Sequence, residues 1–300
     1  MTSARTFESI VIIFNPNSTG DARRLAEELH AELEDLLSYP VDIRLQPTAH
    51  AGHAVELARD AVSGGGDVLV VSASGDGGYN EVVNGVMQGG NPRAVCAVLG
   101  AGNANDHRRS TGSQPLGEAI AEGIVRNIDL LRVHTGEAAD SSAEYAHSYV
   151  GFGLTPVVAI DLEKGGKGAL KEMVSVVRAF SKFEPFEIRQ ADGSHRSLDS
   201  LVLANIPEMA KYATLSDADD SNLCDGKFEV IVFSHMPKWR VLLMALQAAT
   251  KGLGDQPSVS SYSFTTVKPL PYQIDGEVKS VDANMPVRIE CVPAALATLG

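Results

Sequence analysis

A carboxylate lies inside a glycine-rich turn in residues 72–85, where Asp76 stands between Gly75 and Gly77. Glycines allow the backbone to approach a ligand closely, and backbone N–H groups at the start of a helix favour an anion such as phosphate. A bare carboxylate would repel phosphate. Asp76 therefore indicates either a bound divalent cation or a hydroxyl group that must be deprotonated. Taken alone, such a turn is more often a simple connection between a strand and a helix.

Two other polar turns follow apolar runs in the same manner. Residues 10–14 are followed by Asn15 and Ser18, whose side chains offer hydrogen bonds beside the start of a helix. Residues 95–99 are followed by the polar segment 100–109. Each turn comes after an expected strand, and open α/β sheets bind their ligands at the carboxyl ends of the strands. These three turns are therefore candidates for one phosphate-binding edge.

Carboxylates also gather in the second half of the chain. Asp275, Gly276 and Glu277 place two acids around a glycine, although an Asp-Gly pair alone usually marks a hairpin. The stretch 216–226 holds several closely spaced aspartates, which are oxygen ligands suited to Mg²⁺ or Ca²⁺. A solvated loop is the alternative interpretation of that stretch.

Histidines give a weaker indication of a metal site. His50 and His53 are spaced so that both could lie on one helical face and bind a metal. No third ligand is evident near them in the sequence. We therefore interpret both as structural or surface residues.

The first 125 residues alternate between strand-like and helix-like patterns. Expected strands are residues 10–14, 41–45, 68–72 and 95–99, and expected helices are residues 22–37, 50–62 and 79–87. This alternation predicts a parallel sheet with helices on both faces. We expect residues 1–125 to form a three-layer α/β/α domain.

From residue 126 onward, short β-like runs dominate. They are residues 127–133, 146–152, 186–190, 200–205, 228–233, 258–266 and 286–292, and amphipathic helices are expected at 169–183 and 237–250. The runs predict a mainly antiparallel second domain over residues 126–300, whose last residues can pack back on the first domain. The expected fold class is therefore α/β with a β-rich second domain.

Composition argues against several classes of protein. The chain has 300 residues, of which 25 are basic and 38 acidic, so the net charge is −13 and neither nucleic acid nor a polybasic membrane contact is expected. No segment approaches the roughly 20 apolar residues that span a bilayer, and the N-terminus lacks the apolar core of a secretory signal. Cys96, Cys224 and Cys291 are few and far apart, so we expect reduced, buried thiols. A cytoplasmic protein is the expectation.

Four ordered blocks resemble the diacylglycerol kinase catalytic family, which includes bacterial lipid kinases and sphingosine kinases and is related to NAD kinases. The family shows an N-P-x-S-G turn, a G-G-D-G-T-x-N-E-V-x-N-G block, a G-T-x-N-D block and a late D-G-E. The second block matches best, at residues 75–85, and the others fall at 15–20, 100–106 and 275–277. The resemblance spans nearly the whole chain.

The resemblance implies phosphoryl transfer from ATP to a hydroxyl group of a diacylglycerol- or sphingoid-like lipid. The residues that it places around the nucleotide are Asn15, Ser18, Gly75, Gly77, Gly78, Asn80, Glu81, Gly102, Asn103 and Asn105. It also implies that residues 1–125 are the nucleotide-binding domain and that the active site lies in the cleft between the two domains. Phe152 is a candidate lipid contact there, although core packing is the more common role of such a residue.

The same resemblance assigns roles to the acids. Asp76 would work with Mg²⁺ or orient the acceptor hydroxyl, and Glu277 would be the general base, as in bacterial lipid kinases. In sphingosine kinases the base is instead the carboxylate that matches Asp76, and the sequence leaves this choice open. Asp225, and more weakly Asp217, would help to hold a structural magnesium ion.

The chain departs from the family pattern at three positions near the expected phosphates. Ser74 stands where most members carry glycine, while Gly78 and Asn103 replace a threonine or serine. Loss of two hydroxyl donors, at about 0.5–1.5 kcal/mol each, would weaken nucleotide binding without abolishing it.

Three classes of function stay open. The leading one is a lipid kinase that contacts the inner membrane surface transiently, and the second is an NAD kinase-like small-molecule kinase. The third is a catalytically weakened protein that binds a nucleotide or a lipid. An exposed strand edge in the second domain would allow a homodimer.

Overall fold

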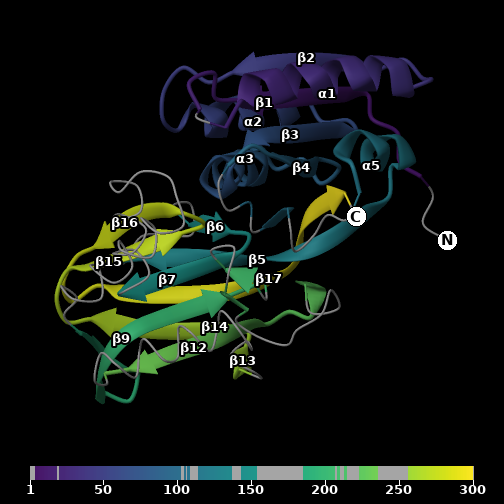
Figure 1. Ribbon diagram of the computed structural model, residues 1–300. Helices are drawn as coiled ribbons and strands as arrows, with labels where there is room; N and C mark the ends of the chain where they lie inside the picture. The colour runs from purple at the N-terminus through teal and green to yellow at the C-terminus, as the bar shows by residue number, and fades with distance from the viewer. Residues whose placement is uncertain are drawn as a thin grey trace. The chain divides into compact units, whose positions relative to one another are not determined.

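The structure is a computed structural model of the chain. It describes residues 4–18, 20–102, 105, 107–108, 114–136, 143–153, 185–206, 208–209, 213–214, 223–235 and 256–299. The chain divides into two compact units (Figure 1). Residues Met1–Leu130 together with Pro293–Gly300 form the first unit, and Leu131–Val292 form the second. The expected α/β fold class, with a β-rich second part, is confirmed.

The first unit contains a parallel sheet with the strand order β2-β1-β3-β4. These strands are β1 (Ser9–Phe14), β2 (Asp42–Pro47), β3 (Val68–Ser74) and β4 (Val95–Gly100). In register, Ile10 of β1 lies opposite Ile43 on one side and Leu69 on the other. The first six residues of β3 are all buried, as expected for a strand covered on both faces. Thr298, in β17 (Pro286–Leu299), extends the sheet by pairing in parallel with Cys96 of β4.

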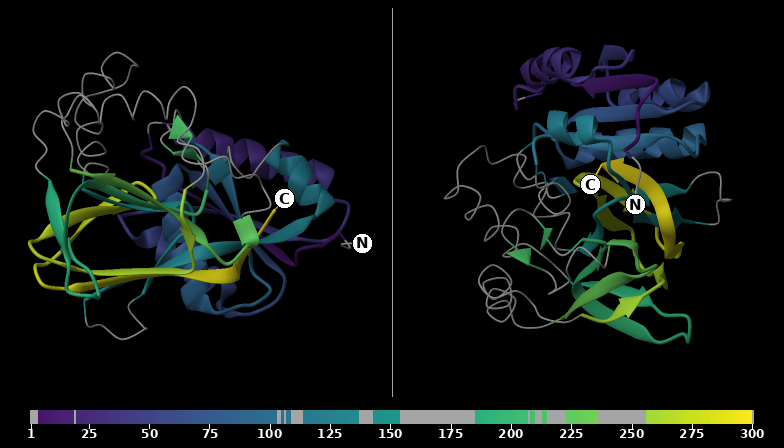
Figure 2. Two further views of the ribbon diagram at one scale, coloured as in Figure 1. Left: turned by 90° about the horizontal axis from the view of Figure 1, so that it is seen from below. Right: turned by 90° about the vertical axis from the view of Figure 1, so that its right-hand side faces the viewer.

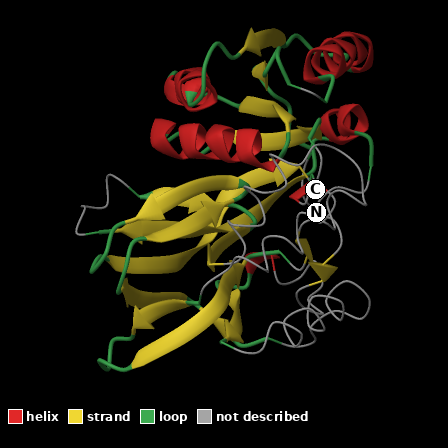
Figure 3. Ribbon diagram, turned by 60° about the vertical axis from the view of Figure 1, so that its left-hand side comes forward, coloured by secondary structure: helices red, strands yellow, loops and turns green. Residues whose placement is uncertain are grey.

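Helices lie on both sides of these strands (Figure 3). Helix α1 (Ala22–Leu36) packs with α5 (Leu116–Glu122), and α2 (His53–Ser63) packs with α3 (Asp76–Gly89). The buried residues of α1 recur at helical spacing and join a core with one face of the sheet. They are Ala22, Ala26, Leu29 and Leu33.

Two helices begin at positions other than those expected. Helix α3 begins at Asp76 rather than at residue 79, so the glycine pair after Asp76 belongs to the first helical turn. Helix α2 begins at His53 because Gly52 has a φ of 78° and does not continue the helix backward. The polar turn before α3 is therefore shorter than the sequence suggested.

The second unit is built from antiparallel strands in the order β16-β15-β7-β9-β8-β14-β17. Their bounds are β7 (Tyr149–Gly153), β8 (Phe186–Arg189), β9 (His195–Ala204), β14 (Ser261–Thr266), β15 (Leu270–Ile274) and β16 (Glu277–Val281). Strand β12 (Phe228–Ser234) pairs with β9 and with β13 (Ser258–Val259). Strands β9 (green) and β17 (yellow) can be followed in Figure 2.

Four further strands are described in this part of the chain. Strand β5 (Val125–Thr135), which contributes residues to both units, pairs with β6 (Glu144–Ala146). A separate two-stranded sheet joins β10 (Glu208–Met209) to β11 (Ala213–Thr214). The amphipathic helices expected at 169–183 and 237–250 lie outside the described residues. Among the residues that the structure describes, no helix is long and apolar enough to cross a membrane.

The structure places two kinds of side chain considered from the sequence. Phe152, a candidate lipid contact with core packing as the favoured alternative, is fully buried and meets the rings of Phe264 and Tyr272 at 5.2 and 5.6 Å between centroids. It is therefore a core residue. The expectation of buried thiols holds for Cys96 but is wrong for Cys224, which is exposed.

Candidate functional site

The three polar turns expected to bind phosphate lie together in the first unit. They follow β1, β3 and β4, and the parallel register sets the ends of these strands side by side. The N–H of Ala101 donates to the carbonyl oxygen of Ser74 at 2.9 Å, which joins the second and third turns. A β-carbon on Gly20 would lie 1.8 Å from the carbonyl oxygen of Ala101, so only glycine allows the first turn to approach the third so closely.

Gly75 and Gly102 make a close backbone contact between the second and third turns. A β-carbon built on Gly102 would lie 2.4 Å from the Cα atom of Gly75, and one built on Gly75 would lie 3.1 Å from the Cα atom of Gly102. The side chain of Asn105 holds this arrangement, because its Oδ1 atom accepts the N–H of Gly102 and its Nδ2 atom donates to the carbonyl of Gly102, both at 2.9 Å. Asn105 thus positions the backbone of the third turn.

A pocket of about 390 Å³ lies beside these turns. Its volume is in the range of about 300–1,000 Å³ that is typical of small-molecule sites. The polar residues that line it are Asn15, Asn17, Thr48, His50, Ser72, Ser74 and Glu81, and the other lining residues are Ile13, Phe14, Ala49, Ala51, Ala54 and Gly78. Among the residues expected around a nucleotide, the pocket therefore brings together Asn15, Gly78 and Glu81.

Thr48, His50 and Ser72 line the pocket but were not among the residues expected around a nucleotide. Thr48 directly follows β2. A polar residue at the carboxyl end of a fourth parallel strand is the sequence feature that could have indicated it as a ligand contact. Ser72 is buried within β3, and its Oγ atom lies 2.6 Å from the Oγ atom of Ser74. The Ser74 hydroxyl also donates to the carbonyl of Gly75 at 3.0 Å.

Asp76 is the first residue of α3 and is partly buried. Its Oδ1 atom accepts the backbone N–H of His107, 3.2 Å away, so the carboxylate faces the turn after β4. It is not among the residues that line the pocket. The imidazole of His107 is buried and packs against Tyr79, with 5.0 Å between ring centroids. A carboxylate near the N-terminus of a helix is also favoured by the helix dipole.

The first turn is held by its own polar side chains. The Oδ1 atom of Asn15 accepts the N–H of Asn17 at 2.9 Å, and the backbone carbonyl of Asn15 accepts the N–H of Ser18 at 3.1 Å. The Ser18 hydroxyl accepts the N–H of Ala22 at 3.4 Å, at the start of α1. Ser18 is therefore placed at the helix start rather than on the pocket wall.

Two other expected nucleotide residues hold helices in place. Asn80 is buried, and its side-chain oxygen accepts the amide of Asn84 at 3.1 Å, one turn further along α3. The Oε1 atom of Glu81 accepts the N–H of Gly52 at 3.2 Å, which ties α3 to the residues before α2. Asn103 lies outside the described residues.

The late acidic motif belongs to the second unit. Asp275 and Gly276 form the two-residue loop between β15 and β16, with φ values of 46° and 98°, as in a type I′ hairpin turn. The Asp275 side chain is completely buried and accepts the backbone N–H groups of His147, Ser148 and Tyr149 at 2.7, 3.0 and 2.9 Å. Asp275 thus fixes the hairpin that carries Glu277.

Glu277 begins β16 and has a side chain that is 34% exposed. Its Oε2 atom lies 3.8 Å from the Nζ atom of Lys279, which in turn donates to Glu144 at 2.7 Å. Burial alone lowers the pKa of Lys279, but the hydrogen bond and charge of Glu144, with the charge of Glu277, raise it above its usual value. The ammonium group therefore stays positive beside Glu277.

The expected magnesium ligands are only partly described. Asp225 is exposed in a turn before β12, and its Oδ1 atom accepts the N–H of Lys227 at 2.8 Å. Asp217 lies outside the described residues.

Comparison with known proteins identifies related sequences. Residues 9–133 match the family model of the diacylglycerol kinase catalytic domain. The chain is 25% identical over 252 residues to the diacylglycerol kinase of Bacillus subtilis, an alignment that covers 79% of this chain and 78% of the relative. It is 24% identical over 292 residues to a Staphylococcus aureus protein (strain MRSA252) named "putative lipid kinase", covering 92% of this chain and 87% of that protein.

Solved structures show the same fold. A diacylglycerol kinase from Bacillus anthracis has a TM-score of 0.72 at 17% identity, with 99% of this chain and 98% of that chain covered. The yeast NADH kinase in complex with NADH has a TM-score of 0.53 at 12% identity, with 98% and 83% covered. At these identities the similarity establishes the fold.

Proposed function

We propose that this chain, whose residues 9–133 match the family model of the diacylglycerol kinase catalytic domain, is an ATP-dependent lipid kinase. It transfers the γ-phosphoryl group of ATP to a hydroxyl group of a diacylglycerol- or sphingoid-like lipid. The observation that carries the proposal is the meeting of three glycine-containing turns at one edge of the sheet, beside a pocket of about 390 Å³.

The nucleotide phosphates bind at the N-terminus of α3 in this proposal. The first intrahelical bond runs from the N–H of Tyr79 to the carbonyl of Gly75, so the N–H groups of Asp76, Gly77 and Gly78 have no helical carbonyl to bond. Such N–H groups and the helix dipole favour phosphate oxygens. The hydroxyl group of Thr48, on the pocket wall, is a further donor to an anion.

Mg²⁺ fits the chemistry of the residues at this turn. Asp76 offers a partly buried carboxylate next to a phosphate-binding helix start, which is a favourable arrangement only when a cation or a transferable proton lies between them. Asp76 would hold Mg²⁺ at this turn, and the ion would supply positive charge to offset the negative charge of the phosphoryl group during transfer. Asp225 and Asp217 are the proposed residues for a structural magnesium ion.

The general base is either Asp76 or Glu277. Proton removal from the acceptor hydroxyl requires a carboxylate within hydrogen-bond reach of it. Asp76 is held by the turn after β4, and Glu277 is held by the hairpin that Asp275 fixes. The two roles are distinguished by substitution, because loss of the base lowers kcat while the KM for ATP stays nearly constant.

The lipid acceptor places the reaction at a membrane surface. We propose that the chain is cytoplasmic and contacts the membrane transiently, in phospholipid metabolism, and that nucleic acid is not a partner. The net charge of −13 supports the last point, because phosphate-rich polymers repel such a chain. The proposed homodimer is tested by the oligomeric state in solution.

The experiment is transfer of labelled phosphate from ATP with Mg²⁺ to diacylglycerol, a sphingoid base, a total lipid extract or NAD, each in a separate reaction. Label in a lipid supports the proposal. Label only in NAD would instead support a small-molecule kinase, the alternative that the fold of yeast NADH kinase favours. ATP binding without transfer to any acceptor would indicate a nucleotide-binding protein with a weakened site.

A further inference from the structure

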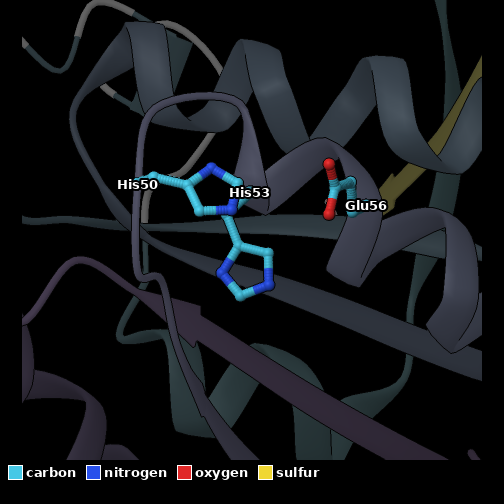
Figure 4. A group of neighbouring side chains, drawn as sticks. All are labelled: His50, His53 and Glu56. Atoms are coloured by element: carbon cyan, nitrogen blue, oxygen red, sulfur yellow. The ribbon is translucent and has the colours of Figure 1, made fainter.

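Two histidines and a glutamate gather where α2 begins (Figure 4). His50 lies just before the helix, His53 is its first residue, and Glu56 is in its first turn. Each side chain offers a ligand atom, and the three atoms lie within 4.8 Å of one another. The imidazole rings of His50 and His53 are stacked, with 4.7 Å between centroids. Glu56 is the third ligand that the sequence did not reveal.

The hydrogen bond of His50 leaves one ring nitrogen ready for a metal. The Nδ1 atom of His50 lies 2.9 Å from the carbonyl oxygen of Ala51. A carbonyl oxygen can only accept, so Nδ1 carries the proton and Nε2 carries the lone pair. A backbone carbonyl that fixes the tautomer in this way is typical of metal-binding histidines.

His53 has the opposite pattern. Its Nδ1 atom accepts the backbone N–H of Ala49 at 3.0 Å, so the proton of the neutral ring is on Nε2. Binding of a metal at Nε2 requires this proton to move to Nδ1 or leave the ring, and a proton on Nδ1 ends the hydrogen bond to Ala49. Metal binding at His53 is therefore coupled to a change in the residues before α2.

The helix dipole and the carboxylate of Glu56 have opposite effects on a cation bound at this site. The N-terminus of a helix repels a cation, because the helix dipole is positive at that end. The carboxylate of Glu56, in the first turn of α2, offsets this repulsion, and the chain as a whole has a net charge of −13. His50 and Glu56 are exposed, so an ion at this position keeps contact with water.

We propose that His50, His53 and Glu56 bind a late first-row divalent ion of the Zn²⁺ class. Imidazole ligands suit Zn²⁺, Cu²⁺ and Ni²⁺, whereas Mg²⁺ prefers oxygen ligands alone. In a tetrahedral site with bonds of about 2.0–2.1 Å, ligand atoms lie about 3.4 Å apart. Binding requires the exposed side chains of His50 and Glu56 to rotate, so that the stacked rings turn their nitrogens toward one ion and the present separation, within 4.8 Å, shortens to that value. The remaining coordination positions are filled by water.

The proposal is tested by titrating the full chain with Zn²⁺ in a calorimeter and with Co²⁺ in a spectrophotometer. One ion per chain and visible d–d absorption from Co²⁺ are expected. His50→Gln and Glu56→Gln should each weaken binding by at least about tenfold. Both residues are exposed, so neither variant should lower the melting temperature of the metal-free chain.

His195→Gln is the matched control. His195 is 51% exposed and lies 2.6 Å from Glu187, so it also pairs an exposed imidazole with a carboxylate but has no second histidine in the pair. Its loss should leave Zn²⁺ affinity and stoichiometry unchanged. Absence of saturable Zn²⁺ binding would overturn the proposal, and so would equal affinity in the wild-type chain and His50→Gln. Neither readout depends on kinase activity.

Discussion

A β-carbon built on Gly78 would lie 2.7 Å from both the Cβ and the Oγ atoms of Ser74. The serine side chain therefore occupies the space that a side chain at position 78 would need. Both residues line the pocket. The two departures from the diacylglycerol kinase pattern, at residues 74 and 78, are therefore sterically coupled.

This relationship predicts non-additive substitutions. Gly78→Thr alone should destabilise the fold by about 1–3 kcal/mol, because the new side chain overlaps Ser74, whose hydroxyl is held by Ser72 and Gly75. Ser74→Gly together with Gly78→Thr should recover most of that loss and restore ATP affinity. Thermal unfolding and ATP titration of the single and double variants measure the coupling. If the effects of the two substitutions on the free energy of unfolding simply add up in the double variant, the steric coupling of residues 74 and 78 is contradicted.

Gly102→Ala should disrupt the phosphate-binding edge. The added methyl group would meet the backbone of Gly75 at 2.4 Å, and two backbones cannot separate without moving the turns on both sides. We expect a lower melting temperature and loss of ATP binding in calorimetric titration. Gly64→Ala is the control, since its β-carbon meets nothing within 4 Å and its φ is −74°. ATP affinity at the wild-type level in Gly102→Ala would show that the contact has no functional role.

Asp275→Ala should destabilise the second unit strongly. The substitution leaves three buried backbone N–H groups without their acceptor, and each such group costs about 1–3 kcal/mol. Asp275→Asn keeps the size of the side chain and the turn conformation, so this variant should lose less stability than Asp275→Ala. Denaturant unfolding measures the free energy of unfolding of the wild-type chain and of both variants. An Asp275→Ala variant as stable as the wild type would refute the structural role of this carboxylate.

Thiol reactivity should differ between the three cysteines. Burial raises the pKa of Cys96 to about 12, so at pH 8 this group stays protonated, and the thiolate is the reactive form. Cys224 is exposed and should be alkylated first in the native chain. The native and the denatured chain are alkylated for increasing times, and mass spectrometry then measures how fast each cysteine is labelled. Native labelling of Cys96 at the rate of Cys224 would show that Cys96 is not buried.

The parts predicted best from the sequence are those with local signals. The apolar run that became β3 and the Asp275-Gly276 pair that became a hairpin turn are decided by residues next to one another. The contact of Gly75 with Gly102 and the burial of Asp275 depend on residues far apart in the chain. The sequence shows that such glycines and acids are present but does not show what they touch.

The sequence also fails to show contacts between residues that are close together in the chain, as at His50, His53 and Glu56. Their spacing was visible, but the identity of the lone-pair nitrogen on each ring follows only from the bonds to Ala51 and Ala49. Thr48 was missed because one polar residue after a strand carries little information until the neighbouring turns are in place. Hydrogen bonds and neighbours in space are therefore what the structure adds.

The most direct test of the kinase proposal compares the wild-type chain with Asp76→Asn in lipid-dependent ATP turnover. The substitution keeps the size of the side chain and its oxygen facing His107, so the melting temperature should stay nearly constant. With Mg²⁺ and micelles of diacylglycerol, sphingoid base or total lipid, we predict turnover in the wild type and at least about a hundredfold lower kcat in the variant. Equal turnover in both proteins would contradict the role of Asp76, and no lipid-dependent turnover in the wild type would contradict the proposed function itself.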